Sequence, residues 1–362
     1  MFATMYSTQA ILPELGRDFA VSPAEAGLTV SAVVVALALA AFVWGPLSDR
    51  IGRKRSLVLA SALLVAPTIG ASLAPTFGTL LACRALQGIC MPGLLTVGIP
   101  YVTEAFVPRI GARAMGYYVS ALVAGGLIGR IGVALVTSVV GWRWAVGGLA
   151  ILPLVGAIVL QRTLPDMPSP ARGAGRSLRR QLTNPRVLRV AFVASTFFFT
   201  FVGTFSYVTY RLERPPFGYG TAIGSLVFVL WLLGATTPLV GRLVDRIGWR
   251  RVVGVALAVC AAGLLLTFPS SIMTLVVGLA AFTLANFAGV TAAQVGIAEA
   301  TDVDRGAASA VYYSLYYGSG GLGGYLPGLA WQTWHWNGIA LIGLAVLSVG
   351  AIALSTSSQD QG

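Results

Sequence analysis

Two arginines stand inside long apolar stretches of this chain, where a charged group is costly. Arg84 lies roughly two turns inside the outer end of its expected helix, and Arg130 lies at a similar depth in the next. An intramembrane cation marks a functional site by default, because removing it from water is expensive. Arginine keeps its proton, so either side chain could bind an anion or tune a carboxylate but could not carry a proton. The alternative is that the side chains reach back to the nearer membrane surface.

A second set of charges lies in a turn that occurs twice. Residues 45–55 read GPLSDRIGRKR, and residues 241–251 read GRLVDRIGWRR, an offset of 196 positions. Asp49 can face the positive end of a helix, while Arg50 and Arg53 can pair with a carboxylate such as Glu104. We expect this cluster to hold the inner side shut in one state; the alternative is that the arginines only set topology. The residues assigned to the gate and its repeat are Gly45, Asp49, Arg50, Gly52, Arg53, Lys54, Glu104, Asp245, Arg246 and Glu299.

Polar and aromatic side chains that interrupt the apolar stretches are candidates for a substrate cavity at the membrane midplane. Their alternative roles are structural, because tyrosines gather at membrane interfaces and amides link helices. The candidates are Tyr6, Gln9, Tyr207, Tyr210, Asn286, Gln294, Tyr312, Tyr313, Tyr316 and Tyr317.

Enzymatic chemistry has little support in the sequence. The one histidine, His335, is placed in an expected outer loop, and the three cysteines Cys83, Cys90 and Cys260 are far apart within apolar stretches. This pattern indicates apolar packing rather than a disulfide or a metal site. A phosphate-binding glycine-rich loop is also missing, so ATP is not expected to drive the protein. We therefore predict no cofactor and no metal.

The composition indicates a membrane protein. Hydrophobic residues make up 56% of the chain and charged residues only 10%, and the mean hydropathy is +0.82. About 20 apolar residues cross the hydrocarbon layer as a helix, and a soluble helix would need a polar face. The expected fold is therefore all-α and integral to the membrane. We expect eleven complete spans at 28–45, 56–73, 79–103, 113–140, 144–161, 190–210, 221–241, 252–268, 272–297, 306–328 and 337–355.

The basic residues predict the orientation. Of the 24 lysines and arginines, 18 fall in alternate loops, which include both charged turns. Positive loops stay in the cytoplasm, so we expect a multi-pass protein of the plasma membrane, most simply a bacterial inner membrane. The formal net charge of +12 is then mostly topology. A nucleic-acid surface is the rival interpretation, but the charges are dispersed over separate loops.

One polar linker divides the chain into similar halves. Residues 162–189 carry seven arginines and four prolines. The expected domains are an N-terminal bundle over 1–161, a cytoplasmic linker over 162–189 and a C-terminal bundle over 190–362. Repeats in the same sense imply a two-fold axis along the membrane normal.

These features resemble the major facilitator superfamily over essentially the whole chain. The first charged turn is similar to its loop signature between helices two and three, and residues 81–88 (LACRALQG) are similar to the helix-four signature of its proton-coupled members. The resemblance implies two six-helix bundles and a monomeric secondary transporter that moves a small molecule by alternating access, with protons as coupling ion. Residues 6–9 and the glycine-rich fifth helix are similar to bacterial drug- and sugar-efflux branches. The Gly-Pro pair usual in antiporters is missing after Val123, which departs from that pattern.

Two alternatives remain beside proton-coupled efflux: a non-transporting membrane sensor or scaffold on the same fold, and an inactive, truncated carrier. The second rests on residues 1–12, an apolar stub before Pro13. It would extend only about 18 Å against a core of ~30 Å. We therefore expect the first helix to be truncated. In the resembled family this helix lines the cavity and can carry a coupling carboxylate.

Overall fold

In the computed structural model, the chain folds into helices that form two compact units. The structure describes residues 1–105, 108–165, 180–301 and 305–356. The first unit comprises Met1–Ser22, Leu28–Gly173 and Gly220–Leu226, and the second comprises Pro23–Gly27, Ala174–Tyr219 and Val227–Gly362.

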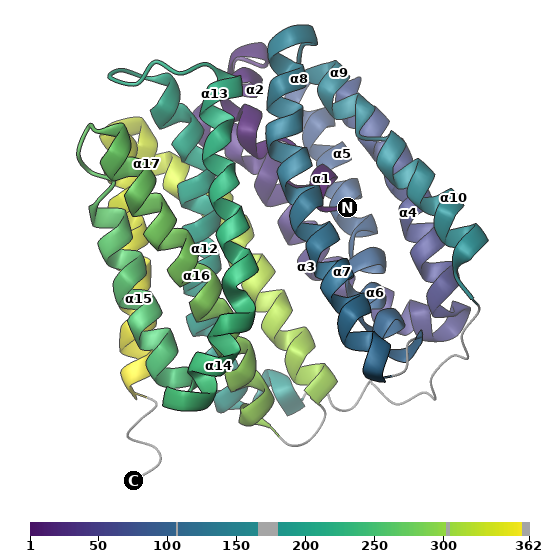
Figure 1. Cartoon of the computed structure of the whole chain (residues 1–362). Helices are drawn as coiled ribbons and strands as arrows, with labels where there is room; N and C mark the ends of the chain where they lie inside the picture. The colour runs from purple at the N-terminus through teal and green to yellow at the C-terminus, as the bar shows by residue number, and fades with distance from the viewer. Residues whose placement is uncertain (106–107, 166–179, 302–304, 357–362) are drawn as a thin grey trace. The chain divides into compact units, whose positions relative to one another are not determined.

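The first unit is built around α4, which lies against α5, α6, α9 and α10 (Figure 1). A capping box starts α5, because the Thr76 hydroxyl accepts from the Thr79 N–H and the Thr79 hydroxyl accepts from the Thr76 N–H. The elements of this unit are α1 (Phe2–Met5), η1 (Gln9–Ile11), α2 (Leu12–Asp18), α3 (Pro23–Ile51, whose first residues belong to the second unit), α4 (Arg53–Ser72), α5 (Phe77–Cys90), α6 (Pro92–Ala105), α7 (Pro108–Leu127), η2 (Ile128–Gly132), α8 (Val133–Val140), α9 (Trp142–Gly148), α10 (Ile151–Thr163) and α13 (Thr221–Gly224).

The second unit is centred on α12 (Pro185–Glu213), which packs against α16 (Ile272–Ala300) and α17 (Arg305–Ser355). The helix begins at Pro185 because Asn184 caps it, accepting from the N–H groups of Arg186 and Val187. Its apolar run is largely buried. The remaining elements of this unit are η3 (Ser225–Thr236), α14 (Thr237–Ile247) and α15 (Trp249–Leu265).

The expected all-α membrane fold is confirmed, but the number of spans differs from the predicted eleven. Within the described residues, nine helices are long and apolar enough to cross a membrane. The expected span 252–268 corresponds to α15, which has 17 residues and is shorter than each of these nine helices. The expected spans 306–328 and 337–355 lie in one element, α17, which is broken by the non-helical backbone of His335. The residues expected to form a stub, 1–12, form short pieces rather than one helix.

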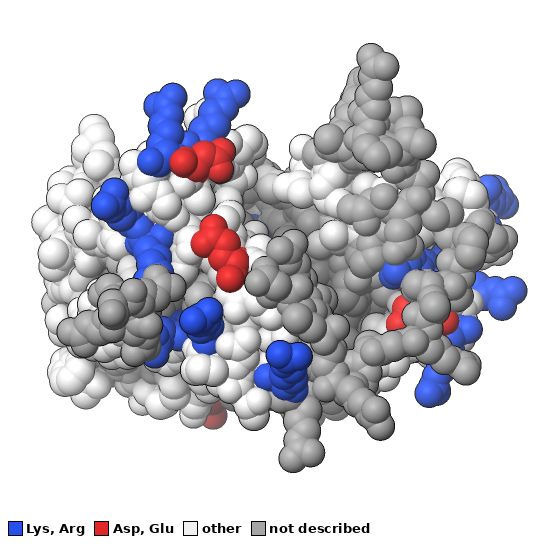
Figure 2. All heavy atoms as spheres, turned by 90° about the horizontal axis from the view of Figure 1, so that it is seen from below, with Lys and Arg blue, Asp and Glu red and all other residues white. Residues whose placement is uncertain are grey.

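Both copies of the charged turn have the same backbone conformation. Gly52 has φ 92° and ψ 148°, and Gly248 has φ 82° and ψ 149°. This region of conformational space is open essentially to glycine alone. The repeat seen in the sequence is therefore a repeat of local structure. Lys and Arg side chains gather on the face of the molecule that Figure 2 shows.

Candidate functional site

Arg84 is fully buried in the first unit and held by neutral acceptors. Its Nε donates to the Thr29 carbonyl at 2.9 Å, and its Nη2 donates to the Met5 carbonyl at 2.6 Å. Its Nη1 donates to the Thr4 carbonyl at 2.8 Å and to Gln87 Oε1 at 2.7 Å. Among the described residues, no carboxylate is bonded to Arg84. A positive charge is therefore stabilised inside the unit by dipoles rather than by a counter-ion.

Two of these carbonyls come from residues 1–11, the first segment of the chain, in which α1 and η1 are separated by a break at residues 6–8. The Gln9 N–H donates to the Tyr6 carbonyl at 3.1 Å, not to the Met5 carbonyl that a continuous α-helix would use. The Met5 carbonyl is thus available to Arg84. Ser7 also turns inward, since its hydroxyl donates to the Thr4 carbonyl and accepts from Arg84. The guanidinium and the broken segment therefore stabilise each other.

Arg130 is the second fully buried arginine and contacts the same segment. Its Nε donates to Gln9 Oε1 at 2.8 Å, and its guanidinium carbon lies 3.8 Å from the centre of the Tyr6 ring. Cation–π contacts of this kind are strong when both groups are desolvated. Arg130 lies in η2, a π-helical turn, and π-helical turns recur at functional sites. Neither arginine reaches back to a membrane surface, so that alternative is wrong.

The glycine-rich stretch before Arg130 lets the first segment approach closely. A Cβ added to Gly129 would overlap the backbone of Ala3. The structure thereby brings four of the predicted residues together. Arg130 contacts Tyr6 and Gln9 from η2, and Arg84 binds the same segment from α5.

The predicted inner gate is present only in part among the described side chains. Arg53 is 9% exposed at the start of α4, and Asp49 is half-buried in the last turn of α3. The side chain of Glu104, their predicted partner, lies outside the described part of the chain. Arg50 in the first turn and Asp245 and Arg246 in the second are exposed. The gate therefore stays a prediction.

Comparison with known proteins assigns the chain to a family. Residues 1–236 and 216–358 match the sequence profile of the Major Facilitator Superfamily. The chain belongs to this superfamily. The uncharacterized MFS-type transporter YybF of Bacillus subtilis is 28% identical over 380 residues, which cover 99% of this chain and 92% of YybF. The inner membrane transport protein YnfM of Escherichia coli is 30% identical over 370 residues, covering 98% of this chain and 87% of YnfM.

A solved structure agrees in fold. The crystal structure of a bacterial homologue of the human lysosomal transporter Spinster matches with a TM-score of 0.75 at 19% identity, covering 98% of this chain and 89% of that chain. The superfamily and these relatives are transporters, so this protein is a multi-pass membrane transporter and not an enzyme.

In the second unit, the transporter's predicted cavity residues fall into two groups along α12 instead of one. Tyr207 stacks on Tyr210 and Trp331, and its hydroxyl donates to the Gly324 carbonyl at 2.8 Å. Phe198 stacks on Tyr316 with ring centres 4.1 Å apart. Tyr312, Tyr313 and Tyr317 join the stack around Tyr316. Phe198 and Tyr207 are nine residues apart, about 13 Å along a helix.

The two predicted amides of α16 have different surroundings. Asn286 is 2% exposed, whereas Gln294 is exposed. Asn286 Oδ1 and Thr283 Oγ1, three positions apart on one face of the helix, have no hydrogen-bond partner among the described residues. Nearby in sequence, Phe282 and Phe287 pack on Phe201. The interior of this unit thus combines aromatic rings with unsatisfied polar atoms, which is the composition of a small-molecule site.

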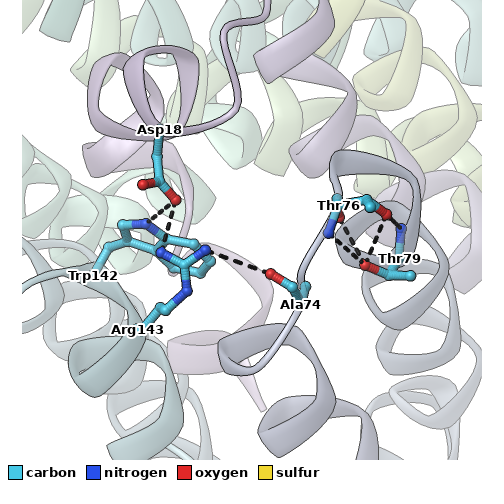
Figure 3. Close-up of polar contacts among 6 residues, drawn as sticks. All are labelled: Asp18, Ala74, Thr76, Thr79, Trp142 and Arg143. Carbon is cyan, nitrogen blue, oxygen red and sulfur yellow. Dashed lines mark hydrogen bonds and ion pairs between the residues drawn. The ribbon is translucent and has the colours of Figure 1, made fainter.

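Sequence reasoning missed two features of the transporter. Gln87 is fully buried and joins Arg84 to the Thr68 hydroxyl. Its position one helical turn after Arg84 was the available signal. Asp18 accepts from Arg143 at 2.8 Å and from the Trp142 ring N–H at 3.1 Å, and Figure 3 shows this cluster beside Ala74. This cluster ties the end of α2 to the start of α9 and to the segment after α4. Its members are far apart in sequence, so no local pattern revealed it.

Proposed function

We propose that this transporter exports an amphiphilic small molecule from a bacterial cell in exchange for protons. It acts as a monomer in the inner membrane, by alternating access of two bundles over 1–161 and 190–362 joined by the linker 162–189. The observation that carries the proposal is the buried guanidinium of Arg84, whose bonded acceptors among the described residues are neutral and include two carbonyls of the broken first segment.

A buried charge without a counter-ion makes the site sensitive to any other charge nearby. Coulombic interactions are several times stronger in the interior than in water. Gain or loss of a proton on a neighbouring group, or arrival of a charged cargo, therefore changes the stability of the state in which Arg84 is enclosed. Because Arg84 binds backbone carbonyls of residues 4 and 5, such a change acts directly on the conformation of the first segment.

The interior of the second unit supports the proposed cargo class. Phe201 contacts Phe205 and Trp231 with ring centres 4.8 and 4.7 Å apart. Such rings favour an apolar or aromatic molecule, and the unsatisfied polar atoms of Asn286 and Thr283 can orient one polar group on it. These features support a drug-like amphiphile better than a sugar. The E. coli relative YnfM supports the inner membrane as the location.

The test uses ethidium as the cargo probe. Bacteria that lack their own drug exporters and express this chain should retain less ethidium than cells with an empty vector. A protonophore should abolish the difference, because export then has no driving force. Arg84→Gln at equal abundance in the membrane should behave like the empty vector. A difference that survives the protonophore would show that protons are not the coupling ion.

A further inference from the structure

A pocket of about 420 Å³ lies in the second unit, away from the aromatic interior described above. It forms where α12 and α15 begin and where α14 and α16 end. Four arginines line it, two from the first turns of α12 and two from the first turn of α15. They are Arg186, Arg189, Arg250 and Arg251. Its lining includes Glu299 and residues 247–251 of the second charged turn, but the four arginines have no role in the predicted gate or in the proposed cargo site.

The pocket is positively charged. Among the described residues that line it, Glu299 is the single acidic one, so this described lining carries a formal charge of +3. The positive end of α15 adds to this charge, because no side chain caps that helix at Gly248. The start of α12 differs, since Asn184 already accepts from its first N–H groups. An anion in this pocket can therefore bind to arginine side chains and also to the uncapped start of α15.

One side of the pocket is apolar. Val190, Val193 and Leu354 line it beside the arginines. Trp249 forms a wall, lying so close to α16 that a Cβ added to Gly296 would be 2.8 Å from its ring. Contact with such an apolar surface would not stabilise a small soluble anion. A molecule with a phosphate group at one end and hydrocarbon at the other matches both parts of the lining.

We propose that this pocket binds the phosphate group of an anionic phospholipid. Guanidinium groups bind phosphate oxygens through paired N–H donors, and basic pockets at the ends of membrane helices suit lipid head groups. The acyl chains would leave past Ile247, which lines the pocket and is 37% exposed. The inference is independent of the cargo and of the coupling ion.

The test titrates the purified full-length protein in detergent with phosphatidylglycerol, monitored by native mass spectrometry. The variant Arg250→Gln/Arg251→Gln should bind this lipid roughly 25-fold more weakly, about fivefold for each arginine lost. The matched control is Arg242→Gln/Arg246→Gln, which removes the same charge from exposed positions of α14 outside the pocket. We expect the control to bind like the wild type. Glu299→Gln, which raises the formal charge of the pocket, should bind about fivefold more tightly.

Two further arms identify the source of the phosphate. Phosphatidylcholine should bind weakly to every variant, and glycerol 3-phosphate at equal concentration should not displace phosphatidylglycerol. Equal losses in the pocket and control variants would overturn the site, as would unchanged binding by Glu299→Gln. Full displacement by glycerol 3-phosphate would show that the pocket takes a soluble anion instead of a lipid. If Arg250→Gln/Arg251→Gln fails to fold, the binding of phosphatidylglycerol by Glu299→Gln and its displacement by glycerol 3-phosphate still decide whether the pocket binds this lipid.

Discussion

At the scale of single residues, the proposed function rests on Arg84. Its guanidinium donates to three backbone carbonyls, Gln87 and Ser7 while being fully buried. Only a planar group with several donors in fixed directions satisfies acceptors spread over two helices and a broken segment. Lysine carries the same charge on a single ammonium group, which cannot donate in all of these directions at once.

We therefore predict that Arg84→Lys abolishes proton-dependent ethidium export and destabilises the protein by about 3–5 kcal/mol, because several buried carbonyls lose their donor. Unfolding in a detergent series gives the stability, and the cell assay gives the export. The control is Arg17→Lys, whose ion pair with Glu14 is exposed and should be worth at most ~1 kcal/mol. Normal export by Arg84→Lys would contradict the role given to the guanidinium fork.

At the scale of elements, the first segment shows what the sequence could and could not reveal. The apolar runs predicted the helices, because each run is long enough to cross the membrane and the charged turns end them. The break at residues 6–8 contains neither glycine nor proline, so no local signal predicted it. It depends on donors from Arg84, which is about 80 positions away. Likewise, only packing could show that the predicted tyrosines of the second unit separate into two groups along α12. Their role as cavity residues stays a prediction.

The close contact between the first segment and η2 gives a prediction for two glycines of η2. Gly129→Ala should destabilise the protein by about 1–3 kcal/mol and reduce export, because its Cβ would overlap the backbone of Ala3. Gly132→Ala is the control, since the nearest atom to its Cβ is Ile128 Cγ2 at 3.7 Å. Detergent unfolding of both variants measures the difference. Equal stability would mean that the segment does not approach Gly129.

The repeated turns give a second prediction at this scale. Gly52→Ala and Gly248→Ala should each cost about 1–3 kcal/mol, because both glycines hold a backbone conformation that a Cβ disfavours. Gly241→Ala is the matched control, since an added Cβ has no neighbour within 4 Å at any of the three glycines, but Gly241 does not have the positive φ of the other two. Thermal unfolding of the three variants in detergent compares them. A control as unstable as the other two would show that backbone strain is not the cause.

At the scale of the whole molecule, each of the two compact units contains one copy of the charged turn. The turn that carries Asp49 and Arg53 has the same backbone conformation at its glycine as the turn that carries Asp245 and Arg246. We interpret the pair as inner gates that close and open as the halves alternate. A charge cluster that forms in one conformational state and breaks in the other biases the equilibrium between the two states without binding the cargo.

Asp49→Asn should accordingly cut ethidium export sharply while leaving membrane insertion intact, because the amide cannot replace the charge in the closed state. Export rates at equal membrane abundance measure this effect. Asp18→Asn serves as a comparison, since that carboxylate bonds to Trp142 and Arg143 at the start of α9 instead of the charged turn. Export at the normal rate by Asp49→Asn would remove Asp49 from the gate.

The central claim, exchange of cargo for protons, is tested most directly in proteoliposomes that contain only this protein. Vesicles loaded at acid pH and diluted into neutral buffer should accumulate ethidium, while an enclosed pH-sensitive dye reports protons leaving. Vesicles without a pH gradient, and vesicles with the Arg84→Gln variant, should do neither. Accumulation of ethidium at the same rate with and without the gradient, or proton loss that does not depend on ethidium, would contradict the account.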